Sequence, residues 1–141
     1  MSIIQSIKDY IITCPYMEQF ARIYVENADY KVVNYSIEPT SGTKIIEEYL
    51  NGDSLRQFHF NINSTKITVD EASRIDNNEF NEKFSDWLET NNKNNVFPFL
   101  DSFKKPTKIE ALNAGFLIMA DESGTTGVYQ LPCLLTYVKK G

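Results

Sequence analysis

In the segment LRQFHFNIN, Leu55 to Asn63, apolar and polar side chains alternate strictly from Gln57 onward. A period of two places successive side chains on opposite faces of a β-strand, so this segment predicts a strand with one buried and one polar face. The turn-forming residues NGDS join it to KIIEEYL, Lys44 to Leu50, and the two arms predict a β-hairpin. The face expected to be polar carries Gln57, His59, Asn61 and Asn63.

Three further segments have the pattern of strands. Val32 to Thr40 alternates and is closed by a proline, while Ile109 to Ala120 and Val128 to Val138 predict two closing strands. The last two are joined by DESGTTG, a run of turn-forming residues that we expect to be a flexible loop. The residues that define this loop are Asp121, Glu122, Ser123, Gly124 and Gly127.

Two segments have helical periodicity instead. Ser2 to Ile12 begins with the capping pattern Ser-x-x-Gln and repeats its isoleucines along one stripe. Asp76 to Thr90 places large apolar side chains at intervals of three and four residues. Between this helix and the closing strands, two prolines in VFPFLDSFKKPT, Val96 to Thr107, predict irregular structure.

The order of these elements is helix, strands, helix, strands, without regular βα alternation. This order predicts an α+β fold, a mixed, mainly antiparallel β-sheet with two main α-helices packed on one face. A chain of 141 residues with 42% hydrophobic residues is sufficient for one core, so residues 1–141 are expected to form a single domain.

Charge and cysteine content exclude several classes of function. The formal net charge is −5, so no global basic field is available to hold nucleic acid or an anionic membrane. Cys14 and Cys133 are far apart and belong to no metal-binding motif, which favours free thiols in a reducing compartment. The N-terminal segment lacks the basic and apolar regions of a signal peptide, so we expect a protein kept in a cytoplasm with no membrane partner.

No constellation of residues in the sequence has the pattern of a catalytic site. His59 is the only histidine, and its neighbours on the same strand face, Gln57 and Asn61, are neither nucleophiles nor carboxylates. DESGTTG lacks the lysine of a phosphate-binding loop and precedes a strand instead of a helix. We therefore predict no catalytic residues, no metal and no cofactor.

Pro132 interrupts the last predicted strand. Proline has no N–H to donate to a ladder, so its presence predicts an edge strand or a bulge. Exposed edges are often paired in symmetric oligomers, and this makes the segment a candidate subunit contact. The residues assigned to this contact are Tyr129, Gln130 and Pro132.

Three stretches, taken in order, resemble the signatures of a phage protein family. They are YLNGDSLRQFHFNI, NNEFNEKFSDWLE and IEALNAGFLIMADESGTTGVYQLPCLLTYV. The family pattern is a strand with Arg-Gln-aromatic-x-Phe, a helix with a Trp near its end, and a closing hairpin with Tyr-Gln, Cys and Tyr. The chain is similar in this way to the tail terminator or minor capsid proteins of phages of Gram-positive bacteria, with Pro132 standing where the family tends to have a polar residue.

The resemblance implies a structural protein of the virion tail or neck, assembled in the host bacterial cytoplasm. Proteins of this family form a homo-oligomeric ring, usually a hexamer, that caps the tail tube, ends tail elongation and contacts neck or head-connector proteins. A sheath protein would be a further partner in a contractile tail, and DNA would only pass through as cargo. Gln57, His59, Asn61 and Asn63 are candidates for the lumen, or alternatively for the outer surface of the sheet.

Two alternatives remain open from the sequence. The chain could be a head-tail connector or another neck protein, because these proteins have similar sizes. Some chains of this kind are labelled chloramphenicol resistance proteins, which would imply a small acetyltransferase. Enzymes of that type resemble the HHxxxD class, which needs a histidine of this motif as general base. The only histidine of this chain lies in QFHFN instead.

Overall fold

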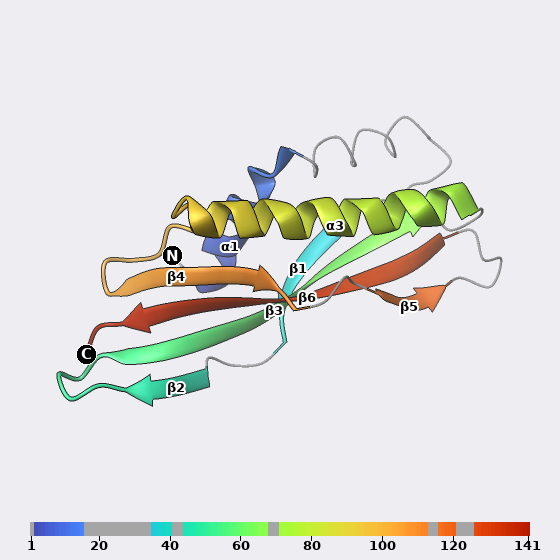
Figure 1. Cartoon of the computed structure of the whole chain (residues 1–141). Helices are drawn as coiled ribbons and strands as arrows, with labels where there is room; N and C mark the ends of the chain where they lie inside the picture. The colour runs from blue at the N-terminus through green and yellow to red at the C-terminus, as the bar shows by residue number, and fades with distance from the viewer. Residues whose placement is uncertain (1, 16–34, 41–43, 68–70, 113–115, 121–125) are drawn as a thin grey trace.

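The computed structural model describes residues 2–15, 35–40, 44–67, 71–112, 116–120 and 126–141 (Figure 1). Within them the chain forms two helices on one antiparallel sheet, which is the α+β fold expected from the sequence. The helices are α1 (Ile3–Ile12) and α3 (Glu71–Lys93). The strands are β1 (Tyr35–Pro39), β2 (Lys44–Glu48), β3 (Ser54–Ile67), β4 (Lys104–Ala111), β5 (Phe116–Ala120) and β6 (Thr126–Lys139).

The sheet is built on one long pair of strands at its centre. Each of the 14 residues of β3 is paired with a residue of β6 in an antiparallel register. The short strands attach to the outer sides of this pair: β1 and β2 pair with β3, and β4 and β5 pair with β6. As a result, one half of the sheet has the order β2-β3-β6-β4, and the other half has the order β1-β3-β6-β5.

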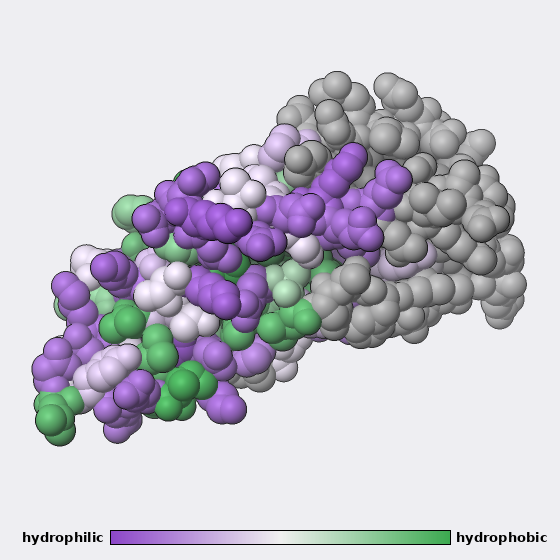
Figure 2. Space-filling model, in the orientation of Figure 1, coloured by the Kyte–Doolittle hydropathy of each residue, from purple (hydrophilic) through white to green (hydrophobic). Residues whose placement is uncertain are grey.

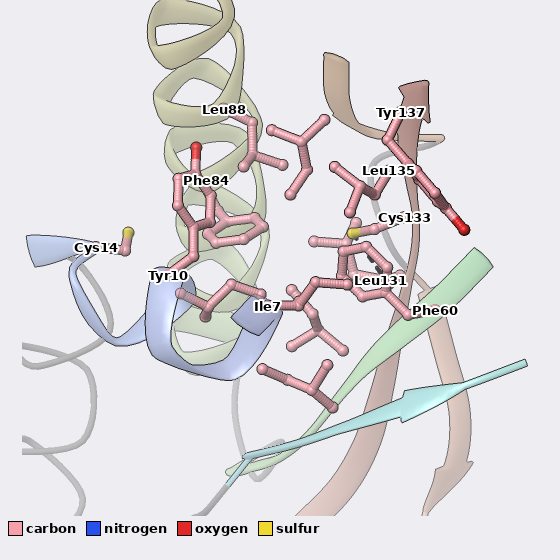
Figure 3. Close-up of a cluster of buried hydrophobic side chains, with 14 of the residues drawn as sticks. Ile7, Tyr10, Cys14, Phe60, Phe84, Leu88, Leu131, Cys133, Leu135 and Tyr137 are labelled. Atoms are coloured by element: carbon pink, nitrogen blue, oxygen red, sulfur yellow. Dashed lines mark hydrogen bonds between the residues drawn. The ribbon is translucent and has the colours of Figure 1, made fainter. Parts of the chain in front are cut away.

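Both helices cover the same face of the sheet, where the core lies. Figure 3 shows Ile7 of α1 and Phe84 and Leu88 of α3 directed toward Leu131 and Leu135 of β6. The strands supply alternate residues to this core, as a period of two requires. From β3 and β6 these are Phe60, Ile62, Leu131, Cys133, Leu135 and Tyr137, all buried.

Local sequence explains where the first helix begins. Ser2 is the N-cap, and its hydroxyl accepts a hydrogen bond from the backbone N–H of Gln5 at 3.2 Å. The buried residues of α1, Ser6, Ile7, Tyr10 and Ile11, recur at helical spacing and form the stripe that packs on the sheet.

Several boundaries differ from those expected. The second helix is longer at both ends than expected: it begins at Glu71 and ends at Lys93. Residues 104–107 are not irregular but begin β4, where Pro106 lies beside a register shift. The single strand expected over 109–120 is divided between β4 and β5, which both pair with β6.

Strand β6 is not an edge strand, so the prediction made from Pro132 is wrong. β6 lies between β3 on one side and β4 and β5 on the other. The carbonyl of Pro132 accepts a hydrogen bond from the N–H of Leu112 at 2.8 Å, so its ring nitrogen faces that same side, where β4 ends and β5 has not begun. A proline is tolerated in this central strand because the neighbouring ladder is interrupted opposite its nitrogen.

The loop expected between the closing strands is shorter than the motif DESGTTG. Gly127 is a buried residue of β6, paired with Lys66 of β3 and Ala120 of β5, so its assignment to a flexible loop is wrong. Two ladders reach Gly127, and they hold it in the sheet. Residues 121–125, including Asp121, Glu122, Ser123 and Gly124, lie outside the described residues.

This account of Pro132 is tested by moving the proline. Pro132→Ala should change the free energy of unfolding by less than about 1 kcal/mol, because no ladder bond depends on that nitrogen. Thr136→Pro should cost roughly 1–3 kcal/mol, because the N–H of Thr136, like the nitrogen of Pro132 four residues earlier, faces β4, where Thr136 is paired with Lys108. Urea denaturation measures both values, and equal costs would contradict the interrupted ladder.

Candidate assembly interface

The four polar residues of β3 lie on the face of the sheet opposite the helices, as the alternation predicted. They are brought together along one strand, and each is only half-buried. Their partners on β6 are mixed in polarity, because Gln57 is paired with Thr136 but His59 with Leu134. Leu134 is only 6% exposed. The face is therefore polar along β3 and partly apolar along β6.

On β6, the residue paired with His59 is the apolar Leu134, whereas the residue paired with Asn63 is the polar Gln130. Across Leu134 from His59 lies Glu110 of β4, whose carboxylate forms an ion pair with Lys108 at 2.9 Å. That ion pair raises the pKa of the Lys108 ammonium. The side-chain oxygen of Asn63 is buried without a hydrogen-bond partner. In the described part of the chain, no three His, Cys, Asp or Glu side chains are grouped as metal ligands.

The three residues assigned to a contact edge do not lie at one. Tyr129 is buried, and Gln130 and Pro132 are half-buried between strands. Gln130, for example, is paired with Asn63 of β3 on one side and Phe116 of β5 on the other. An edge contact of this sheet must therefore use its outer strands.

The outer edge of β4 is closed by the end of helix α3. The side-chain amide of Asn92 donates to the carbonyl of Ile109 at 2.6 Å and accepts from its N–H at 2.9 Å. These two bonds satisfy the backbone groups that Ile109 directs away from β6. Pro106 and the lysines at the start of β4 further disfavour strand addition at this edge.

Strand β2 forms the opposite edge of the same half of the sheet, and it is open. All five of its residues are exposed, and Ile45 and Ile46 are 45% and 44% exposed. The turn that follows is well defined: Tyr49 N–H donates to Asp53 at 2.8 Å and Gly52 N–H donates to Tyr49 at 3.0 Å. Gly52 adopts a φ of 95°, which favours glycine. This turn presents Leu50 fully exposed.

A second apolar surface lies in the segment before β4. Phe99 and Phe103 are 82% and 63% exposed, beside a groove of about 710 Å³ that runs along residues 95–107. Asp101 fixes the turn, since it accepts from the Phe103 N–H at 3.0 Å and pairs with the Lys104 ammonium at 2.9 Å. The hydrogen bond from Lys104 is the main reason that the pKa of Asp101 is lowered.

Helix α1 anchors the start of this segment. The buried Tyr10 hydroxyl donates to the carbonyl of Val96 at 3.0 Å and accepts from the Asn91 side chain at 2.8 Å. Burial raises the pKa of Tyr10, against the smaller opposite effect of Asn91, so the hydroxyl stays protonated and can donate. The groove is thus held by contacts at both of its ends.

Figure 2 shows apolar side chains on the surface at the end of the molecule that carries the tip of the β2–β3 hairpin. Sequence reasoning missed Leu50 and Phe99 as candidates. The only signal was a large apolar side chain next to turn residues, in LNGD and FPFLD. Such a position is as typical of a buried loop residue as of an exposed one.

The two cysteines are buried and do not form a disulfide. Burial strongly raises the pKa of the Cys133 thiol, so it remains protonated and is a poor nucleophile. Cys133 is therefore a core residue and not a candidate for catalysis.

Comparisons with known proteins add no assignment. No protein-family model matches the chain, and a search of curated proteins found no match. Among the described helices, none combines the length and the apolar character needed to cross a bilayer.

The closure of the β4 edge is tested at Asn92. Asn92→Ala should lower the free energy of unfolding by about 1–3 kcal/mol, because two backbone groups of Ile109 lose their partner. Asn92→Asp keeps the acceptor for the Ile109 N–H but turns the donor into a carboxylate oxygen that faces the Ile109 carbonyl, so it should also be destabilising. Thermal and urea unfolding provide the values.

The neighbouring residue Lys93 is exposed and supplies the control, Lys93→Ala. We expect Asn92→Ala, but not the control, to aggregate more readily, because it frees a strand edge. Equal stability and solubility of the two variants would contradict a protective role for Asn92.

Proposed function

We propose that the chain is the tail terminator of a phage or phage-tail-like particle, a structural subunit that forms a homo-oligomeric ring. The ring caps the tail tube, ends its elongation and joins the tail to the neck. The observation that carries the proposal is the presence of two different exposed apolar surfaces on the two sides of one half-sheet. These surfaces are the β2 side with Leu50 and the segment beside β4 with Phe99.

Ring symmetry explains why two different surfaces are required. In a ring each subunit contacts its two neighbours through unlike patches, whereas a twofold dimer uses one patch twice. Monomeric proteins rarely leave large apolar side chains clustered in solvent without an interaction to make. Leu50 follows β2 and Phe99 precedes β4, the two outer strands of this half of the sheet, and this separation supports head-to-tail association.

The order of sequence motifs supports the more specific identity. LRQFHFNI lies in β3, FNEKFSDWLE lies in α3, and YQLPCLLTY lies in β6. The three motifs that resemble the tail terminator family thus occupy the central strand pair and the helix over it. Their side chains include core residues of each element, such as Phe60, Phe84 and Cys133.

The negative net charge of the chain is compatible with a ring through which DNA passes. A net charge of −5 for each copy repels phosphate, so DNA would pass through the ring as cargo without binding. Under this proposal the partners are further copies of the chain, the tail tube protein and neck or head-connector proteins. A contractile tail would add the sheath protein.

Association and tube capping test the proposal together. Native mass spectrometry and light scattering of the purified protein should give one closed oligomer, a hexamer being the expected number. Electron microscopy with assembled tubes should show it at tube ends, and tubes grown in its presence should be shorter. A protein that is monomeric alone and never binds tube ends would contradict the proposal.

The same experiment separates a neck protein from a terminator. A neck protein would form an oligomer that binds the head connector but leaves tube growth unchanged. An acetyltransferase would instead need acetyl transfer that is lost in His59→Ala, and we expect no such activity, because Leu134 is the paired neighbour of His59 across the strands.

A further inference from the structure

The tip of the β2–β3 hairpin has the shape of a preformed binding element. Leu50 stands fully exposed at the end of a turn closed by two backbone hydrogen bonds between Tyr49, Gly52 and Asp53. The side chain of Asn51 adds a bond from the Asp53 N–H at 3.0 Å. Because the turn is already ordered, burying Leu50 against a partner would cost little conformational entropy.

The groove along residues 95–107 is the complementary feature. Among the residues that line it, Phe97 is half-buried, Phe99 is 82% exposed and Leu100 is 7% exposed. Its position is fixed by Tyr10 at Val96 and by Asp101 in the turn before β4. It is therefore an ordered, mostly apolar depression with an exposed aromatic ring, which is suited to an aliphatic side chain.

Charges beside the two features are opposite. Glu47 and Glu48 are exposed on β2 next to the tip, and within the described structure neither forms an ion pair. Lys104 and Lys105 line the groove; Lys104 is paired with Asp101, whereas Lys105 is exposed and forms no ion pair with a described residue. One surface thus offers two available carboxylates and the other an available ammonium group.

From these observations we propose that the tip of the β2–β3 hairpin of one copy docks into the groove along residues 95–107 of the next copy. Leu50 would pack against Phe97 and Phe99, with Glu47 or Glu48 beside Lys105. The occupant of the groove is thus a second copy of this chain. This inference rests on the proposed function, because it names the subunit contact of the ring.

The contact is made by side chains and not by continuation of the sheet. Asn92 already occupies the outward backbone groups of Ile109, and Pro106 has no N–H to offer. Strand β2 of a neighbouring copy therefore cannot extend the ladder along that part of β4. The available contact lies in the groove beside β4, where Phe99 and Lys105 are exposed.

The tip follows β2 and the groove precedes β4, and these strands are the two outer strands of the half-sheet with the order β2-β3-β6-β4. A copy that donates its tip to one neighbour still has its groove free for another. Such a heterologous contact repeats from copy to copy and closes into a ring when its rotation allows it.

Mixing two defective variants tests the proposal directly. Leu50→Asp should abolish docking of the tip, and Phe99→Asp should block the groove, so that each variant alone is monomeric. Both positions are highly exposed, so circular dichroism should show that both variants fold normally. Mixed together, they should form a 1:1 dimer, because one intact tip meets one intact groove.

A charge exchange and a control complete the experiment. Lys105→Glu should weaken assembly by about tenfold, which is typical of a lost interfacial charge pair, and Glu48→Lys in the same chain should restore much of it. Leu112→Asp introduces the same charge at another exposed apolar residue, 47% exposed and outside both surfaces, and should assemble as the wild type.

The outcomes separate this inference from the proposed function. If the wild type forms a ring and Leu50→Asp still forms it, the contact is wrong while ring formation stands. If each variant is monomeric but their mixture stays monomeric, the two surfaces do not meet and the contact is also wrong. A wild type that neither oligomerises nor binds tubes would overturn the function itself. Binding of a tube subunit, instead of a second copy, to the groove of the Leu50→Asp variant would overturn the choice of occupant.

Discussion

The pairing of β3 with β6 is the interaction on which the rest of the structure depends. Both strands have 14 residues, and every other strand attaches to one of them. Their alternation also sets the two faces of the sheet. Phe60 and Leu135 face the helices, whereas Gln57 and His59 face away from them. A shift of one residue in this register would exchange the faces and bury the polar set.

Because the central strands β3 and β6 are long and the strands beside them are short, the sheet has several strand edges. Two of these edges differ in how they are covered. The β4 edge is closed by Asn92 at Ile109 and contains Pro106. The β2 edge keeps all its residues exposed and continues into a tip with Leu50. In the ring that we propose, this asymmetry would direct association toward a contact between unlike surfaces and away from indiscriminate strand addition. It is the physical basis for the ring that we propose.

Much of the architecture could be predicted from local patterns. The alternation around Phe60, the turn NGDS and the capping pattern at Ser2 each describe short-range geometry, and the structure contains the hairpin and the helix that they indicate. The role of Pro132 could not be predicted in this way. Its environment depends on where β4 stops and β5 begins, which is set by pairing with distant residues.

The candidate surfaces were harder to predict than the core. An apolar residue in a turn looks the same in sequence whether it is buried or exposed, so neither Leu50 nor Phe99 was distinguishable from a core residue. The assigned edge at Tyr129 failed for the related reason that a strand's neighbours are not encoded locally. Only the fold reveals that β2 and the segment before β4 are the outer elements at this end of the sheet.

Hydrogen exchange on the assembled protein, compared with the monomeric Leu50→Asp variant, tests the central claim most directly. The account predicts that assembly protects two segments together, residues 47–52 at the tip and residues 96–105 along the groove. The polar face from Gln57 to Asn63 should exchange equally in both forms. Protection confined to that face, or to only one of the two segments, would contradict the account.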